Sequence, residues 1–168
     1  MPRPSLNDCA TYYQPYIAIS LATEPINASV DSFDKINSTL AKINSEKALF
    51  KYAPEKWSIK ELIQHLIDTE RIFAYRALSI ARGENKMTSF DQDIYVKKSN
   101  ADYRVWNDLV NEMKFVRESS ILLFKSFDAT MLNTFGEMAE KPVSVNALAF
   151  IIAGHQIHHT SNIEQKYL

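Results

Sequence analysis

The distribution of histidine is the feature of this chain most suggestive of chemistry. Among 168 residues there are only four histidines. Three of them, His155, His158 and His159, lie close together near the C-terminus, and His65 lies far upstream. Residues four apart share one face of an α-helix, so His155 and His159 should stack one turn apart, with His158 about 100° around the helix. Such a pair could supply two ligands to a metal ion.

His65 is the candidate for a third ligand. It lies between Leu62 and Leu66 and borders the apolar face of a predicted helix. Histidines on two long helices can converge inside a helical bundle, where such proteins build metal sites. Three neutral imidazoles plus water form an open, catalytic type of zinc site, whereas a closed structural site takes a fourth protein ligand. Alternatively, the histidines are core residues with hydrogen-bond partners, since an unsatisfied buried polar group costs about 1–3 kcal/mol.

Other polar residues could assist this chemistry. His155 is followed by Gln156, so the pair is not an H-E-x-x-H motif and the general base of a zinc protease is missing. Asp68 could orient His65 or accept a proton, or it could simply pair with a neighbour. Three arginines of the same predicted helix could meet a carboxylated small molecule or form surface ion pairs: Arg71, Arg76 and Arg82.

A long connection, "GENKMTSFDQDIYVKKSN" at residues 83–100, separates two predicted helices. Loops of this length often cover a functional site. Asp91, Asp93 and Tyr95 could therefore border a pocket, although a solvated loop is the alternative interpretation.

Apolar residues at steps of three and four predict four long helices. Ser58 and Glu61 have the spacing of a capping box, which sets the start of the second helix. A shorter helical segment containing Pro15 precedes the first helix. The four predicted helices cover residues 27–43, 58–82, 101–127 and 144 to near the C-terminus. The absence of strand-like alternation and the presence of only three glycines favour an all-α four-helix bundle with a short extra N-terminal helical segment, in one domain spanning residues 1–168.

Composition narrows the classes of partner. Nineteen Lys and Arg nearly balance twenty Asp and Glu, so the net charge of -1 gives no electrostatic footprint for nucleic acid. No stretch approaches the ~20 apolar residues of a membrane span, and the N-terminus lacks the apolar core of a secretion signal. The single cysteine, Cys9, fits a reducing compartment. We therefore expect a cytoplasmic protein with no nucleic-acid or membrane partner.

Three stretches of the chain resemble the DinB-like superfamily of metal-binding four-helix proteins. They are "KWSIKELIQHLIDTERIFAYRALSIARGE", "FDQDIYV" and "PVSVNALAFIIAGHQIHH", and the match runs from about residue 52 to residue 168. The resemblance implies an up-down-down-up bundle (DinB/YfiT-like), often a homodimer, that holds a divalent metal ion. Carried over to this sequence, the metal ligands are His65, His155 and His159, and His158 is not an expected ligand. Zinc or nickel is the expected metal.

The resemblance offers several functions rather than one. Some relatives are S-transferases that use low-molecular-weight thiols such as bacillithiol or mycothiol, one branch isomerises maleylpyruvate, and others were described as metal-dependent hydrolases. The resemblance thus favours a metal-dependent enzyme with a small-molecule substrate, such as a thiol S-transferase. The alternatives are a metal-dependent hydrolase, a non-enzymatic metal-binding protein of the stress response, and a helical interaction protein whose histidines are core residues.

Overall fold

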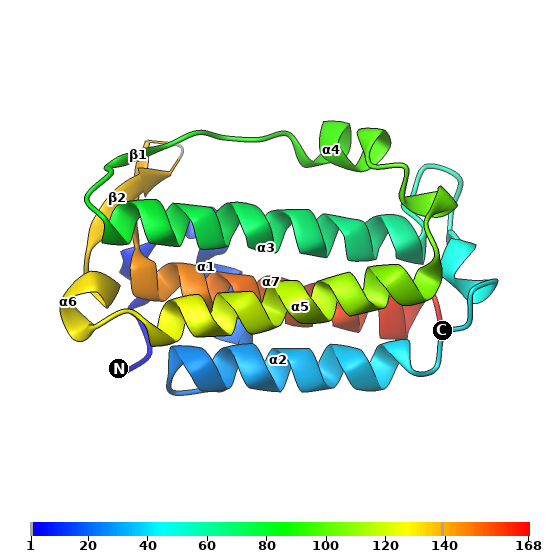
Figure 1. Ribbon diagram of the computed structural model, residues 1–168, viewed down its shortest axis with the longest axis horizontal. Helices are drawn as coiled ribbons and strands as arrows, with labels where there is room; N and C mark the ends of the chain where they lie inside the picture. The colour runs from blue at the N-terminus through cyan, green and yellow to red at the C-terminus, as the bar shows by residue number, and fades with distance from the viewer. Residues whose placement is uncertain (1, 139) are drawn as a thin grey trace.

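Four long helices form the body of the protein. The computed structural model describes residues 2–138 and 140–168. The bundle helices are α2 (Pro25–Leu40), α3 (Ile59–Ala81), α5 (Trp106–Lys125) and α7 (Val145–Lys166). Figure 1 shows by its colours that α2 and α7 run in one direction along the bundle and α3 and α5 in the other. The predicted up-down-down-up bundle is therefore confirmed.

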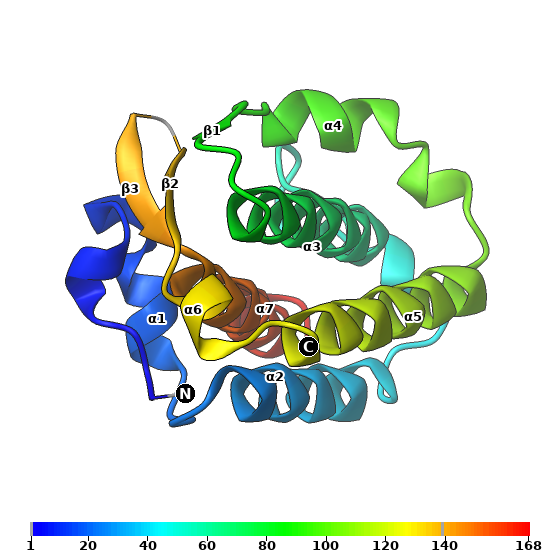
Figure 2. The ribbon, with the colours of Figure 1, turned by 60° about the vertical axis from the view of Figure 1, so that its left-hand side comes forward.

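The order of the helices around the bundle explains the long connection in the middle of the chain. α3 packs against α5 and α7, and α2 packs against the same two helices. Because α3 and α5 are parallel neighbours, the chain must travel back along the bundle, about 34 Å for a helix of the length of α3, before α5 can begin. The connection, residues 82–105, carries the short helix α4 (Gln92–Lys98) and runs outside α3 (Figure 2). We name this connection the crossover segment.

Local sequence signals set the ends of α3. The Ser58 hydroxyl accepts a hydrogen bond from the Glu61 N–H, and the Glu61 carboxylate accepts one from the Ser58 N–H, so the predicted capping box is confirmed. The helix ends before Gly83, whose φ of 97° lies in the left-handed region that glycine adopts most easily. The predicted start of the third helix at residue 101 was wrong. Asn100 has left-handed φ and Val105 is extended, so α5 begins only at Trp106.

A small sheet that we did not predict closes one end of the bundle. It contains β1 (Lys86–Met87), β2 (Phe135–Met138) and β3 (Lys141–Ser144). β2 pairs antiparallel with β3 and parallel with β1, so the sheet ties the start of the crossover segment to the start of α7. These strands are two to four residues long, too short for the alternation of buried and exposed residues to stand out in the sequence.

One ion pair is buried among three of the bundle helices. The Arg117 side chain is fully buried and donates to both carboxylate oxygens of Glu70, over 2.9 and 2.8 Å. The same guanidinium donates to the Ser29 carbonyl oxygen at 2.9 Å and to the Ser32 hydroxyl at 2.8 Å. This network joins α5 to α3 and α2 at the level of the core.

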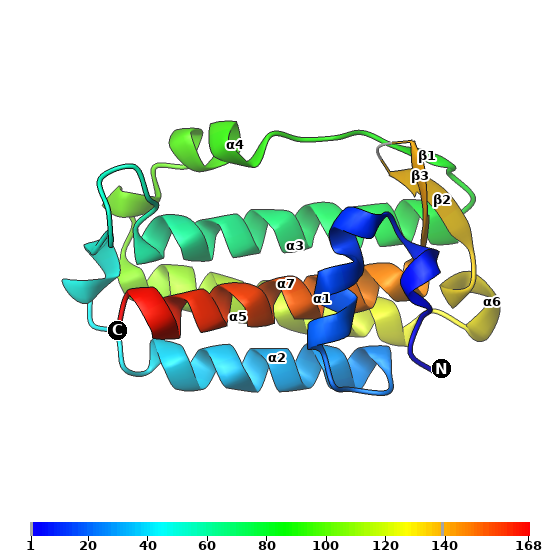
Figure 3. The same cartoon turned by 180° about the vertical axis from the view of Figure 1, so that it is seen from behind.

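The predicted N-terminal helical segment is confirmed as α1 (Gln14–Ile19), with Pro15 in its first turn. α1 crosses the outside of α7 at a steep angle (Figure 3). The crossing is close because Gly154 of α7 has no side chain. A Cβ at this position would lie 1.8 Å from the Tyr16 carbonyl oxygen.

Replacing Gly154 by alanine should therefore destabilise the protein. The clash is with backbone, so α1 must move away from α7, and overpacking of this kind costs about 1–3 kcal/mol. Alanine is the better helix former by about 1 kcal/mol, so any loss of stability reports the clash. Urea unfolding measures it, with the exposed position Gln165→Ala on the same helix as control. Equal stability of the wild-type protein and the Gly154→Ala variant would contradict the close crossing.

None of the helices in the described part of the chain is long and apolar enough to cross a membrane.

Candidate metal centre

Three histidine side chains meet between α3 and α7. The Nε2 atom of His155 lies 3.1 Å from the Nε2 atom of His65 and 3.1 Å from that of His159. One ring nitrogen from each of the three residues lies within 4.8 Å of the others. The helices bring together the three histidines that the sequence singled out, two from consecutive turns of α7 and one from its antiparallel neighbour α3.

Hydrogen bonding alone does not account for this arrangement. The Nε2 atom of a neutral imidazole carries either one proton or one lone pair, so His155 can use it for only one of its two contacts. Zinc binds imidazole nitrogens at about 2.0–2.1 Å, which in a tetrahedral site places two nitrogens about 3.3 Å apart. The two separations from His155, 3.1 Å each, are close to this value, and the third pair of nitrogens lies within 4.8 Å. The donor set and its spacing therefore fit a divalent ion.

Burial keeps these rings neutral, which is the protonation state that binds a metal. His65 is 2% exposed and His155 is 8% exposed. Desolvation lowers the pKa of His65 to about 4. The pKa of His159 falls to about 3, first through desolvation and then through repulsion from His65 and His158. Desolvation and the neighbouring histidines lower the pKa of His155 well below its ordinary value.

These pKa shifts predict how the metal-free protein responds to acid. The unfolded chain binds protons at its histidines near pH 6.5, whereas the folded protein keeps His65 and His159 neutral down to about pH 4 and about pH 3. The free energy of unfolding should be constant above about pH 7 and fall below it, by up to roughly 1.4 kcal/mol per pH unit for each histidine. Urea unfolding of metal-free protein across this range measures the effect. An equal loss in a variant with His65 and His159 replaced by leucine would assign it to other groups.

Neighbouring side chains hold the three histidines in place. The Trp57 ring lies against the His65 ring with centroids 4.8 Å apart. The Thr69 hydroxyl is 3.4 Å from Nδ1 of His65, and Tyr16 meets His155 edge-on at 5.3 Å. Sequence reasoning did not identify these three residues as part of the site. Thr69 could have been found, because it lies four residues after His65 on the same helical face.

Of the two roles that the sequence left open for Asp68, the structure shows pairing with a neighbour. Its carboxylate accepts a hydrogen bond from the Gln64 side chain at 2.9 Å, and the partner of the His65 Nδ1 atom is Thr69. The Asp68 carboxylate also interacts electrostatically with Glu112 of α5, so it faces that helix. The Gln156 side chain is also directed elsewhere, with its amide nitrogen 3.9 Å from the sulfur of Met113 on α5.

Two other potential ligands take no part in the cluster. His158 is not among the three clustered ligands, and its Nε2 lies 3.0 Å from the Asn162 side chain. Cys9 is buried and is not among them either. Desolvation raises the pKa of its thiol to about 11, so it stays protonated.

Two cavities reach the histidine cluster from different sides. The first, of about 240 Å³, contains His65 and His155 in its wall, and we name it the aromatic cavity. Its other lining residues are Tyr12, Tyr13, Tyr16, Thr69, Phe73, Phe90 and Gln92. The second, of about 250 Å³, contains His159 and more charged groups, and we name it the polar cavity. Its other lining residues are Tyr52, Glu55, Lys56, Trp57, Leu62, Asp93, Asn162 and Tyr167.

The crossover segment borders both cavities, as the sequence predicted in part. Phe90 and Gln92 line the aromatic cavity and Asp93 lines the polar cavity. Asp91 instead caps α4 by accepting hydrogen bonds from two backbone N–H groups. The Tyr95 ring packs edge-on against Phe90, with the centroids 5.3 Å apart. The segment therefore forms one wall of the space around the histidines.

Comparison with known proteins agrees with this architecture. Residues 30–163 match the family model of the DinB superfamily. The fold is similar to that of YfiT from Bacillus subtilis, described as a probable metal-dependent hydrolase with an unusual four-helix bundle topology (TM-score 0.75, 10% identity, 84% of this chain and 82% of that one). It is also similar to a DinB-like protein, YjoA, from Bacillus subtilis (TM-score 0.61, 19% identity, 83% and 86%). No curated protein is significantly similar to this chain in sequence.

Proposed function

Because this chain belongs to the DinB superfamily, we propose that it is a divalent-metal-dependent enzyme that acts on a small molecule as a thiol S-transferase. His65, His155 and His159 are the proposed metal ligands, and zinc or nickel is the proposed metal, since imidazole suits both. The observation that carries the proposal is the convergence of three imidazoles, two of them buried and that of His159 partly buried, in the walls of two cavities.

The number of ligands favours catalysis over a structural role. Within the described residues, the cluster contains three histidines and no fourth histidine, cysteine or carboxylate. Structural zinc sites are normally closed by four protein ligands, whereas catalytic ones keep a position for water or substrate. A divalent ion bound here would lower the pKa of a thiol or a water molecule and so supply a nucleophile near neutral pH.

We assign substrate binding to one cavity and proton transfer to the other. The aromatic cavity is lined by aromatic rings, hydroxyl groups and the Gln92 amide, without a carboxylate, so it suits the body of an organic substrate. The polar cavity contains two carboxylates, Glu55 and Asp93, that can accept a proton.

In the proposed reaction, a carbon–sulfur bond forms between the thiol and an electrophile. The leaving group departs with its electron pair, and the thiol proton passes to one of these carboxylates or to solvent.

A thiol is a better match to this site than water as the nucleophile. Gln156 stands where an H-E-x-x-H protein has its glutamate, so that general base for a metal-bound water molecule is missing, and the two carboxylates near the cluster line the polar cavity alone. A thiol has a pKa of about 8.5 and needs much less help than water to ionise.

The experiment combines spectroscopy with turnover on one sample. In the cobalt-substituted protein, a small thiol should change the visible spectrum of the metal, and the same protein should couple that thiol to a model electrophile more than about 10-fold faster than metal-free protein. An unchanged spectrum with a broad panel of thiols would overturn the S-transferase assignment.

Hydrolysis is the second candidate, favoured by the description of YfiT as a probable metal-dependent hydrolase. It predicts metal-dependent cleavage of esters or amides without any thiol. A bound metal with no turnover in either assay would favour a non-enzymatic metal-binding protein, such as a stress-response protein. Homodimerisation stays a prediction, and the mass of the protein in solution tests it.

A further inference from the structure

One buried arginine near the histidines has no negatively charged partner. Arg76 of α3 is 3% exposed, and within the described residues no carboxylate pairs with it, the one titratable neighbour that influences its pKa being Tyr13. Its guanidinium donates to the Thr88 carbonyl oxygen and lies 2.9 Å from the sulfur of Met138. Both acceptors are uncharged, so they only partly replace the water that the cation loses on burial.

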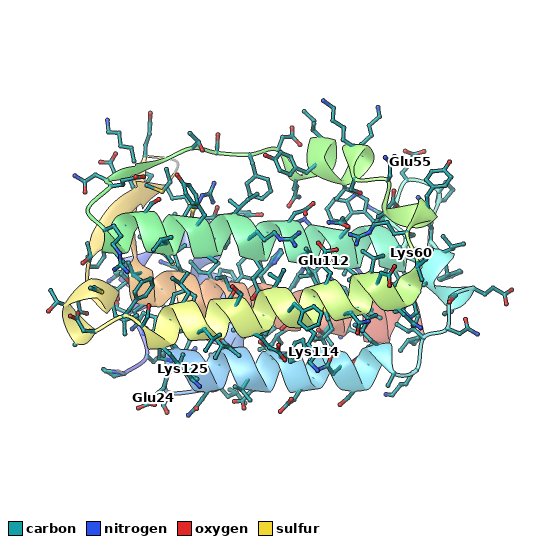
Figure 4. The ribbon with its side chains drawn as sticks, in the orientation of Figure 1. Glu24, Glu55, Lys60, Glu112, Lys114 and Lys125 are labelled. Carbon is teal, nitrogen blue, oxygen red and sulfur yellow. The ribbon has the colours of Figure 1, made fainter. Side chains whose placement is uncertain are left out.

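The other two arginines of α3 are placed differently. Arg71 donates to Glu112 of α5 at 2.6 Å, and Figure 4 shows Glu112 lying between α3 and α5. Arg82 is exposed at the end of the helix. Of the three arginines that the sequence offered as anion-binding candidates, only Arg76 is both buried and free of a carboxylate.

Arg76 adjoins the aromatic cavity. Its guanidinium carbon lies 5.1 Å from the centre of the Phe73 ring and 5.6 Å from that of Phe90, and both rings line the aromatic cavity. Arg76 itself lines a neighbouring cavity of about 260 Å³ that contains no carboxylate. Phe90 belongs to the walls of both cavities, so they meet at this ring of the crossover segment.

We propose that Arg76 binds the anionic end of a substrate whose other end reaches the three histidines through the aromatic cavity. This inference rests on the proposed function and specifies the substrate class: a thiol that carries a carboxylate some distance from its sulfur, with an apolar or aromatic middle. A carboxylate would supply the counter-charge that Arg76 lacks, through paired hydrogen bonds to the guanidinium.

The helix sets the length of this substrate. His65 and Arg76 are about 16 Å apart along the axis of α3. The side chains of both residues lean towards the N-terminus of the helix, so only the greater length of the arginine shortens this gap, to roughly 12–15 Å, of which a metal–sulfur bond and a hydrogen bond would span a part. Phe90 must turn aside for a ligand to pass from one cavity to the other.

Thiols of graded length test the inference. The cobalt-substituted protein is titrated with ω-mercaptooctanoate, whose extended length is close to this gap, and with its uncharged amide. Mercaptopropionate and its amide, which are too short to reach Arg76, form the second pair. Dissociation constants come from the cobalt spectrum and from calorimetry. The wild-type protein should bind the long carboxylate at least ~10-fold more tightly than the long amide, and the short pair about equally.

The variants separate recognition from folding. In Arg76→Gln the preference for the long carboxylate should fall to about onefold, while Arg76→Lys keeps part of it. Arg82→Gln, the matched control on the same helix, should keep the full preference. All three should retain one metal per chain, and ligand-free Arg76→Gln should unfold at a temperature no lower than the wild type.

Each contrary result has one meaning. If the thiols change the cobalt spectrum but the long carboxylate and amide bind equally, the role of Arg76 is overturned and the proposed function stands. If Arg76→Gln keeps the preference but melts at a lower temperature, Arg76 has only a structural role. If no thiol changes the spectrum, the proposed function falls, and this inference falls with it.

Discussion

Replacing His155 by alanine will remove tight divalent-metal binding. His155 is the central residue of the cluster, with its Nε2 atom 3.1 Å from both of the other Nε2 atoms, so its loss leaves two imidazoles that no third protein ligand joins. Even the loss of a residue that only supports a metal ligand costs 10–100-fold in affinity, so removal of a ligand should cost at least ~100-fold. Calorimetric titration with zinc and with nickel, together with elemental analysis after dialysis, measures the loss.

His158→Ala is the matched control for this experiment. The residue lies on the same helix, three positions away, and is not part of the cluster. Its removal should leave the metal content unchanged. Equal metal content in the wild-type protein and in the His155→Ala variant would refute the site, and loss of metal from His158→Ala alone would mean that the ligands had been misassigned.

Replacing Arg117 by methionine will cause a large loss of stability. The change leaves the Glu70 carboxylate buried without its two hydrogen bonds, and it also removes the donors to Ser29 and Ser32. Breaking a buried ion pair by removing one partner costs about 3–5 kcal/mol, because the remaining charge has lost both water and its partner. Urea unfolding of the metal-free protein gives the difference directly.

Two comparisons show whether this loss comes from the unpaired charge. Lys114 and Glu118 form an exposed pair on α5, with side chains 55% and 53% exposed, so Lys114→Ala should cost no more than ~0.5 kcal/mol. The double variant Arg117→Met with Glu70→Leu removes both charges and should recover much of the stability. If the double variant is no more stable than the single one, packing around Arg117 rather than its charge is responsible.

The sequence predicted the bundle well because its helices carry strong local signals. Apolar residues at helical spacing located all four, and the capping box of Ser58 and Glu61 set the start of α3. The errors fall where short-range geometry overrides helical propensity. The left-handed conformation of Asn100 delays the start of α5, and the strands around Gly136 exist only because they pair with one another. Pairing between segments far apart in the chain leaves little trace in so few residues.

The three clustered histidines could be predicted, whereas most of their surroundings could not. His155 and His159 are linked by helical periodicity, and His65 was added from its apolar face and from a family resemblance. Trp57 precedes its helix and Tyr16 comes from α1, so only the tertiary fold brings them to the histidines. The lack of a carboxylate partner for Arg76 is likewise a property of the folded protein, because a sequence does not show which charges are paired.

The parallel arrangement of α3 and α5 has a consequence for how proteins of this architecture can diversify. The crossover segment has to pass along α3 whatever its sequence, and along the way it supplies a wall to the cavities beside the histidines. The proposed metal ligands therefore belong to rigid helices, while part of the cavity wall beside them belongs to a segment that can change length and composition at little cost to the core. Because the histidines and the crossover segment are separate in this way, substrate preference can change during evolution while the three-histidine cluster stays the same.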